Sequence, residues 1–193
     1  MKDHSLAALR RQIDESRALL GEYLDLYQIH SATLESGVLD DPAVLAELNT
    51  LRAGGLTIGM SVSGPRQSEV IRRALAVRVD GVNPFQSVQA TWNLLDPSAG
   101  PALVEAHAAG WGVIIKEALA NGRLADRDQE AIAAALANPW VDVVLSGAVT
   151  ETQVRSNAGA LGVHLSPDRL AQLSTLAEPP EQYWKERGQL AWH

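Results

Sequence analysis

The 193-residue sequence contains no cysteine, which excludes a disulfide framework, a thiol nucleophile and a cysteine-ligated metal. It has no apolar run near the roughly 20 residues that span a bilayer, and its N-terminus lacks the apolar core of a secretory signal. Basic residues are scarce: 16 Lys and Arg stand against 23 Asp and Glu, for a net charge of −7. These absences predict a cytoplasmic protein that has neither a membrane nor a nucleic acid as its partner.

Linkers and metal-ligand patterns are also missing. No block of proline, serine or charge divides the chain, and 46% of its residues are hydrophobic. The sequence therefore predicts a single domain over residues 1–193, with a C-terminal tail over residues 178–193. There is no His-x-His, no HExxH and no dense carboxylate cluster, so no metal site is expected.

Short apolar runs alternate with amphipathic helical segments along the chain. Runs of this composition favour parallel pairing, with helices packed outside the sheet, in a barrel-like or doubly wound α/β fold. Several helix starts are marked: Ser5 and Asp41 are expected N-caps, and Thr150 with Gln153 forms a capping-box pattern. The predicted strands are residues 24–30, 56–62, 85–89, 111–116 and 141–146.

Five segments in order resemble the later strand–helix units of the aldo-keto reductase family. They are LDLYQIH, IGMSVS, VQATWNLL, GWGVIIKEALANGRL and SGAVTETQVRSN. The resemblance covers essentially the whole chain and implies a partial (β/α)8 TIM barrel of the aldo-keto reductase type, with about five parallel strands and outer helices. It also implies NADPH or NADH as the cofactor and a small-molecule carbonyl compound, an aldehyde or ketone, as the substrate.

In this family a Tyr donates a proton to the carbonyl, a Lys and an Asp tune that Tyr, and a His orients the substrate. His30 matches the histidine and ends its strand, where barrel enzymes place their chemistry. The other three residues belong to earlier units, so the sequence is expected to be a truncated family member. None of Tyr23, Tyr27 and Tyr183 is expected to replace the acid, and strand alternation points Tyr27 towards the helices.

Two groups of residues match the cofactor contacts of the family. The group that holds the nicotinamide carboxamide is matched by Ser61, Gln89 and Asn93. Val62 stands where the family has an Asn, and Gln89 is equally compatible with an ordinary buried amide. The phosphate end is a glycine-containing turn before a capped helix, whose N–H groups and dipole attract phosphate. It consists of Ser146, Gly147, Thr150, Gln153 and Asn157. Val149 stands where many family members have an Arg that binds the 2′-phosphate of NADP, so the preference between NAD and NADP stays open.

Lys116 and Glu117 end the fourth predicted strand. Lys116 stands where many family members have an aromatic residue that stacks on the nicotinamide. A lysine cannot stack in this way, but it can pair with a phosphate or act as a base or amine nucleophile beside a carboxylate. The alternative is an internal contact between Lys116 and Glu117, just as His30 can be a strand-end histidine bonded to the backbone.

Three functions therefore stay open. The first is NAD(P)H-dependent reduction of an aldehyde or ketone, with the missing acid supplied elsewhere. The second is a non-redox dehydratase, isomerase or cyclase that uses His30, Lys116 and Glu117 as its catalytic groups. The third is a non-catalytic fragment or oligomerising paralogue. In each case the open strand edges predict a homo-oligomer or a complementing chain.

Overall fold

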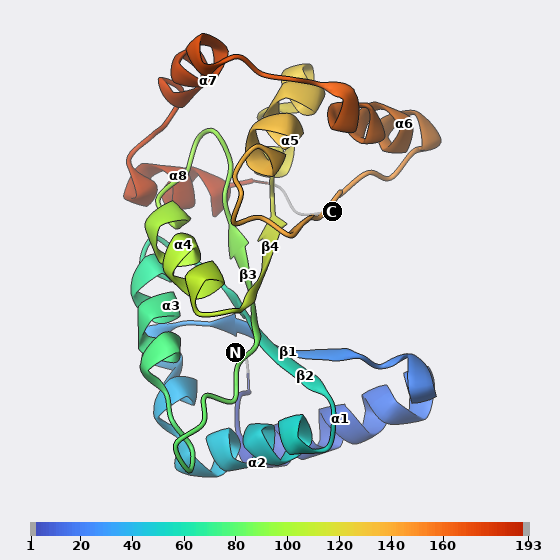
Figure 1. The fold of residues 1–193 in the computed structure, drawn as a ribbon, viewed down its shortest axis with the longest axis vertical. Coiled ribbons are helices and arrows are strands. Elements are labelled where there is room, and N and C mark those ends of the chain that lie inside the picture. Colours follow the sequence, from blue (N-terminus) through green and yellow to red (C-terminus); the bar gives the residue numbers. More distant parts are fainter. Residues whose placement is uncertain (1–2, 191–193) are drawn as a thin grey trace.

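The computed structural model describes residues 3–190, so residues 191–193 of the predicted tail lie outside it. Its centre is a sheet in which every strand is parallel to its neighbours and pairs with the next strand in the sequence (Figure 1). The predicted parallel α/β arrangement is therefore confirmed. The strands are β1 (Leu26–Ala32), β2 (Thr57–Val62), β3 (Ser87–Thr91), β4 (Gly112–Lys116) and β5 (Val143–Val144).

Helices alternate with the strands. The α-helices are α1 (Leu6–Leu20), α2 (Pro42–Ala53), α3 (Gln67–Ala76), α4 (Gly100–Ala108), α5 (Asp128–Leu136), α6 (Glu151–Gly159), α7 (Pro167–Ser174) and α8 (Pro180–Arg187). Short 3-10 turns lie at Gly21–Tyr23, Leu34–Ser36, Val38–Asp40, Ala120–Gly122, Ala125–Arg127 and Ala160–Gly162. No helix within residues 3–190 is both long enough and apolar enough to cross a bilayer.

The predicted helix starts are confirmed, whereas the strand bounds differ from the prediction. β1 is shifted by two residues, to Leu26–Ala32 from residues 24–30, and β2 and β4 each begin one residue later than predicted. Ser5 and Asp41 accept the N–H groups of the first helical turns of α1 and α2. β3 begins at Ser87 rather than residue 85, because the side chain of Asn83 takes the N–H of Phe85 at 2.8 Å. β5 is only two residues long rather than residues 141–146, although backbone hydrogen bonds from Asp142 to Val113 and from Leu145 to Ile115 flank it.

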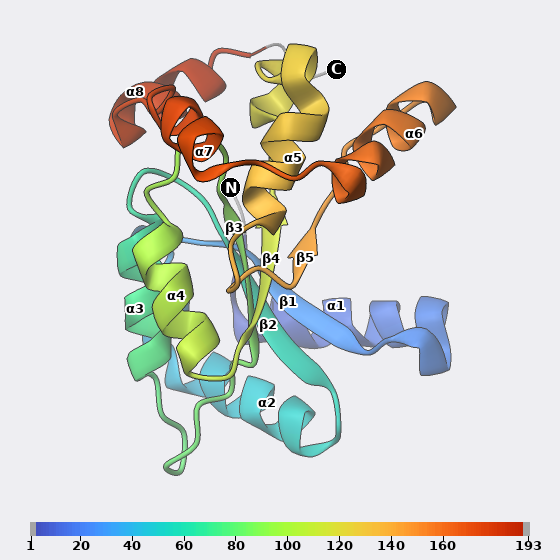
Figure 2. The ribbon, with the colours of Figure 1, turned by 45° about the horizontal axis from the view of Figure 1, so that its top comes forward.

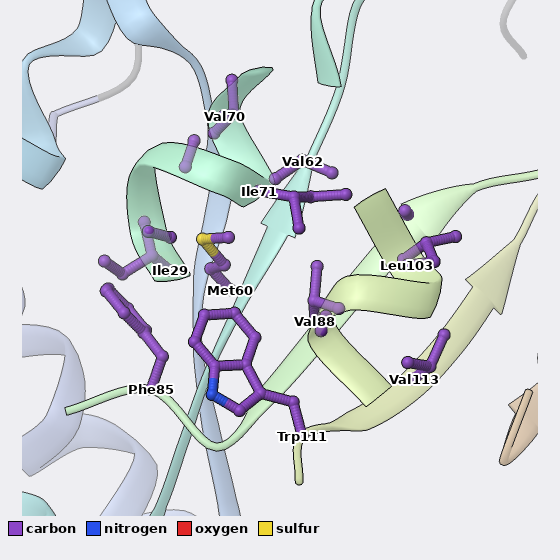
Figure 3. Packing of buried hydrophobic residues seen from close by; sticks show 14 of the residues in the cluster. Ile29, Met60, Val62, Val70, Ile71, Phe85, Val88, Leu103, Trp111 and Val113 are labelled. Carbon is purple, nitrogen blue, oxygen red and sulfur yellow. The ribbon is translucent and has the colours of Figure 1, made fainter. Parts of the chain in front are cut away.

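One face of the sheet is apolar and packs under helices. Alternation places Ile58, Met60 and Val62 of β2 on this face, and all three are fully buried. All three belong to one cluster with Ile71 of α3 and Leu103 of α4, and Figure 3 shows Met60 and Val62 beside these two helix residues. α3 and α4 lie side by side along this side of the strands (Figure 2). The opposite face, here called the inner face, therefore receives the alternate residues of each strand.

The C-terminal helix α8 is tied to the loops that follow β3 and β4. The buried hydroxyl of Tyr183 accepts a hydrogen bond from Asn93 Nδ2 at 3.0 Å. Trp184 Nε1 donates to Asp96 Oδ2 at 2.9 Å, and Arg187 forms an ion pair with Glu117. These contacts join residues about 70 to 90 positions apart, so α8 fixes the carboxyl ends of two strands.

The ion pair between Glu117 and Arg187 should make the stability of the protein depend on pH. Burial raises the pKa of Glu117, but the hydrogen bonds and charge of Arg187, with smaller contributions from Asn121 and Lys116, outweigh burial and leave the pKa below its usual range. At pH 7 Glu117→Gln should therefore lower the free energy of unfolding by about 1–3 kcal/mol. This difference should persist above the unfolded-state pKa of about 4.3 and shrink as the pH falls through the lower folded-state pKa.

Urea unfolding of both proteins between pH 7 and pH 3 measures this difference. Glu151→Gln is the matched control, because its ion pair with Arg155 is highly exposed and should contribute less than about 1 kcal/mol. A Glu117→Gln effect that is no larger than that of Glu151→Gln, or one that grows towards low pH, would contradict the assignment.

Candidate functional site

The inner face carries small and polar side chains in rows across the strands. The first row joins Gln28, Gly59, Ser87 and Gly112 as register partners. Gly59 is required there, because a Cβ would lie 2.2 Å from Ser87 Oγ. Gln28 Oε1 and Ser87 Oγ are buried without hydrogen-bond partners. Such orphaned polar atoms are uncommon in protein cores and mark this face as one built for polar contents.

Lys116 lies at the carboxyl end of the inner face. Its Nζ donates to Ser63 Oγ at 2.9 Å and to Ser61 Oγ at 3.2 Å. Because β3 lies between β4 and β2, the lysine side chain crosses β3 on the inner face to reach these serines. The structure thus brings together two predicted site residues, Lys116 and Ser61, from opposite sides of Gln89, which is the register partner of Ser61.

His30 is exposed and lies where the edge strand β1 loses its regular pairing. The register with β2 shifts between Ile29 and Ala32, and Ser31 adopts a positive φ of 53°. The backbone carbonyl of His30 lies 3.0 Å from the imidazole Nε2 of His4. Ser31 Oγ lies 3.4 Å from Ser63 Oγ, so a line of hydroxyls leads from the residue beside His30 to Lys116.

Glu117 and Asn93 are held by other parts of the protein. Glu117 has a positive φ of 57°, and its carboxylate accepts from Arg187 and from Asn121 Nδ2. Its low pKa keeps it ionised at neutral pH. The fully buried amide of Asn93 donates to Tyr183 and to the Glu117 carbonyl, and accepts the N–H groups of Leu95 and Asp96. Asn93 therefore organises the loop after β3 with its whole amide.

The phosphate-end residues gather around one cavity. The Thr150–Gln153 capping box forms, and the Gln153 side chain also accepts the N–H of Val149 at 2.9 Å. Asn157 Nδ2 donates to Ser146 Oγ at 2.8 Å, which ties α6 to the end of β5. A cavity of about 570 Å³ lies between the loops after β4 and β5. Four of the five predicted residues line it: Ser146, Gly147, Gln153 and Asn157.

Sequence reasoning missed several residues of the site. Ser63 follows β2 and carries one of the two serine contacts of Lys116. Arg187 binds the carboxylate of Glu117, which lies 70 positions earlier in the sequence, and no local sequence pattern predicts such a contact. Strand alternation alone, however, could have placed Ser63 on the same face as Ser61. Within residues 3–190, no group of three or more metal-ligating side chains is found.

Comparison with known proteins identifies relatives by family and by fold. The model of the aldo/keto reductase family matches residues 1–134, whereas no curated protein matches the chain. The holo form of aldo-keto reductase AKR11C1 from Bacillus halodurans superposes with a TM-score of 0.73 at 18% identity, over 93% of this chain and 67% of that one. A thermostable aldo-keto reductase in complex with the inhibitor epalrestat gives 0.62 at 23% identity, over 88% of this chain and 66% of that one.

The chain thus spans about two thirds of the length of these structures. At such identities the structures show a shared fold, five consecutive parallel strands of a partial (β/α)8 barrel. The family model covers well over half of the sequence. The chain therefore belongs to the aldo/keto reductase family.

Proposed function

We propose that this chain binds NADPH or NADH along the carboxyl ends of β2 to β5 and takes part in reducing an aldehyde or ketone. The observation that carries the proposal is the cavity of about 570 Å³ between the loops after β4 and β5. Its volume is that of a typical ligand pocket. The capping box of α6 occupies the N–H groups of Thr150 and Gln153, which leaves those of Glu151 and Thr152 as first-turn donors for a phosphate.

The nicotinamide end of the proposed site lies on the inner face. Ser61 and Gln89 are register partners, and the partly exposed amide of Gln89 offers the donor and acceptor that a carboxamide needs. Asn93 is left out of this set because its amide is fully used in the loop after β3. When bound, the cofactor would supply the hydride, and His30 would orient the carbonyl.

The proposal needs a proton donor beyond the three tyrosines of this sequence. Tyr27 packs with the apolar core, and burial raises its pKa. Burial also raises the pKa of Tyr183, whose hydroxyl is bound to Asn93. Tyr23 is exposed in the turn before β1, away from the carboxyl ends of the strands. Another part of the protein or a complementing chain would carry the acid.

A non-redox reaction by His30, Lys116 and Glu117 has no observation in its favour. Such a role requires Glu117 to exchange protons near Lys116. Its carboxylate is instead ionised and bound by Arg187, while Lys116 donates hydrogen bonds to Ser61 and Ser63.

Cofactor binding is tested with a substitution that fills the cavity. Gly147 lines it, and a Cβ at this position meets no atom within 4 Å, so Gly147→Leu should fold normally and occupy the nucleotide space. Fluorescence titration should show micromolar binding of NADPH or NADH to the unmodified chain and at least about tenfold weaker binding to Gly147→Leu. The control Gly162→Leu has equal room outside the cavity and should bind normally. Absence of saturable binding of both cofactors would overturn the proposal.

The role of His30 is tested by separating binding from turnover. His30→Gln should lower the rate of NADPH oxidation with an aldehyde by at least about 100-fold, since the carbonyl loses its orienting donor. NADPH affinity should stay within about twofold, and the exposed His164→Gln should change neither quantity. An unchanged rate in His30→Gln, measured with the part that carries the acid present, would contradict reduction through His30.

We also propose that a second copy or a complementing chain covers the open sheet edges. Val143 and Leu145 at the β5 edge are 45% and 42% exposed, and β1 pairs only with β2 among the described strands. Exposed strand edges of this kind tend to pair. Sedimentation of the purified chain should give a mass above that of one 20.7 kDa chain. A single species of 20.7 kDa at all concentrations would contradict self-association.

A further inference from the structure

The cavity between the loops after β4 and β5 has an acidic wall. Its charged lining residues are Glu117 and Asp128, and within residues 3–190 no lysine or arginine lines it. The carboxylate of Glu117 is bound by Arg187 and by Asn121 Nδ2, so its charge is compensated. The negative charge of the wall therefore comes from Asp128.

Asp128 is the first residue of α5 and is partly exposed. Its Oδ1 accepts the N–H of Gln129 at 2.7 Å, and no other hydrogen bond or ion pair of this carboxylate is found in the described part of the chain. A carboxylate only accepts hydrogen bonds. Asp128 can therefore bind a ligand hydroxyl through Oδ2, whereas it repels a phosphate.

The arginines of the segments around the cavity are engaged with carboxylates. Arg123, Arg127 and Arg155 each form an ion pair, with Glu178, Asp126 and Glu151 respectively. Val149 stands where many family members have an Arg that binds the 2′-phosphate of NADP, and it is 86% exposed. The charges of the described residues at this end of the site thus favour a ligand hydroxyl over a second phosphate.

The two sides of the cavity suit different parts of a dinucleotide. The first turn of α6, after β5, offers N–H donors for the pyrophosphate, and Asp128, after β4, offers an acceptor for a sugar hydroxyl. We propose that Asp128 is a specificity-determining residue: its carboxylate accepts the 2′-hydroxyl of the adenosine ribose, so that this chain binds NADH more tightly than NADPH. This inference rests on the proposed cofactor binding.

A 2′-phosphate changes this contact in two ways. It removes the hydroxyl that donates to Asp128, and it adds about −1.5 to −2 charges at pH 7 beside a carboxylate. Like charges that face each other weaken binding. Acidic side chains bind the ribose 2′-hydroxyl of NAD in the same way in doubly wound dinucleotide-binding folds. NADPH therefore still binds through its other contacts, but more weakly than NADH.

Fluorescence titration of the full chain with NADH and with NADPH tests this role, because the two cofactors differ only in the 2′-phosphate. The unmodified chain should bind NADH at least about tenfold more tightly than NADPH. In Asp128→Asn the ratio of the two affinities should fall below about threefold, since the repulsion is removed. The control Asp168→Asn removes an acid from the first turn of another helix, α7, outside the cavity, and should keep the unmodified ratio.

A second substitution adds a cation at the same end of the site. Because Val149 is highly exposed and follows the cavity residue Ala148, Val149→Arg should fold normally, raise NADPH affinity at least about tenfold and change NADH affinity less than about threefold. If Asp128→Asn does not fold, the ratio in Val149→Arg decides. Equal binding of NADH and NADPH by the unmodified chain, or an unchanged ratio in either variant, would overturn the role of Asp128 and leave the proposed function standing. Saturable binding of neither cofactor would overturn both.

Discussion

Burial of one sheet face under helices decides where the strand side chains of the candidate site point. Ile58, Met60 and Val62 are fully buried against the helical layer, so the intervening residues Gly59 and Ser61 must face the other way. A one-residue slip would move the apolar set to the inner face and the polar set under the helices. The same alternation in β3 and β4 places Gln89 and Lys116 beside Ser61. Packing energy on one face therefore fixes the chemistry of the other.

The helix α8 adds a second, long-range constraint. Arg187 holds Glu117, and Glu117 with Asn121 lines the cavity between the loops after β4 and β5. Tyr183 and Trp184 anchor the same helix to the loop after β3 through Asn93 and Asp96. One wall of the proposed nucleotide cavity thus depends on a helix from the C-terminal tail. This arrangement explains why Glu117 follows the strand end yet serves structure more directly than proton transfer.

Local signals in the sequence predicted much of this arrangement. The capping box at Thr150 and the glycine turn at Gly147 are short-range patterns, and the structure gathers most of the predicted phosphate end around one cavity. The roles of Asn93 and Glu117 were not predictable in the same way, because their partners Tyr183 and Arg187 lie 90 and 70 positions away. β5 also pairs over fewer residues than its apolar run suggested. The family and fold of the chain follow from the sequence and the comparisons, whereas the contacts of α8 with the loops after β3 and β4 could be found only in the structure.

Hydrogen exchange with and without NADPH tests the central claim most directly, namely that the ends of β4 and β5 hold the nucleotide. The account predicts slower exchange in residues 117–128 and 145–157 when NADPH is present, with little change in the exposed turn at Gly21–Tyr23. Cofactor binding that protects other segments and leaves these two unchanged, or no protection at saturating NADPH, would contradict the account.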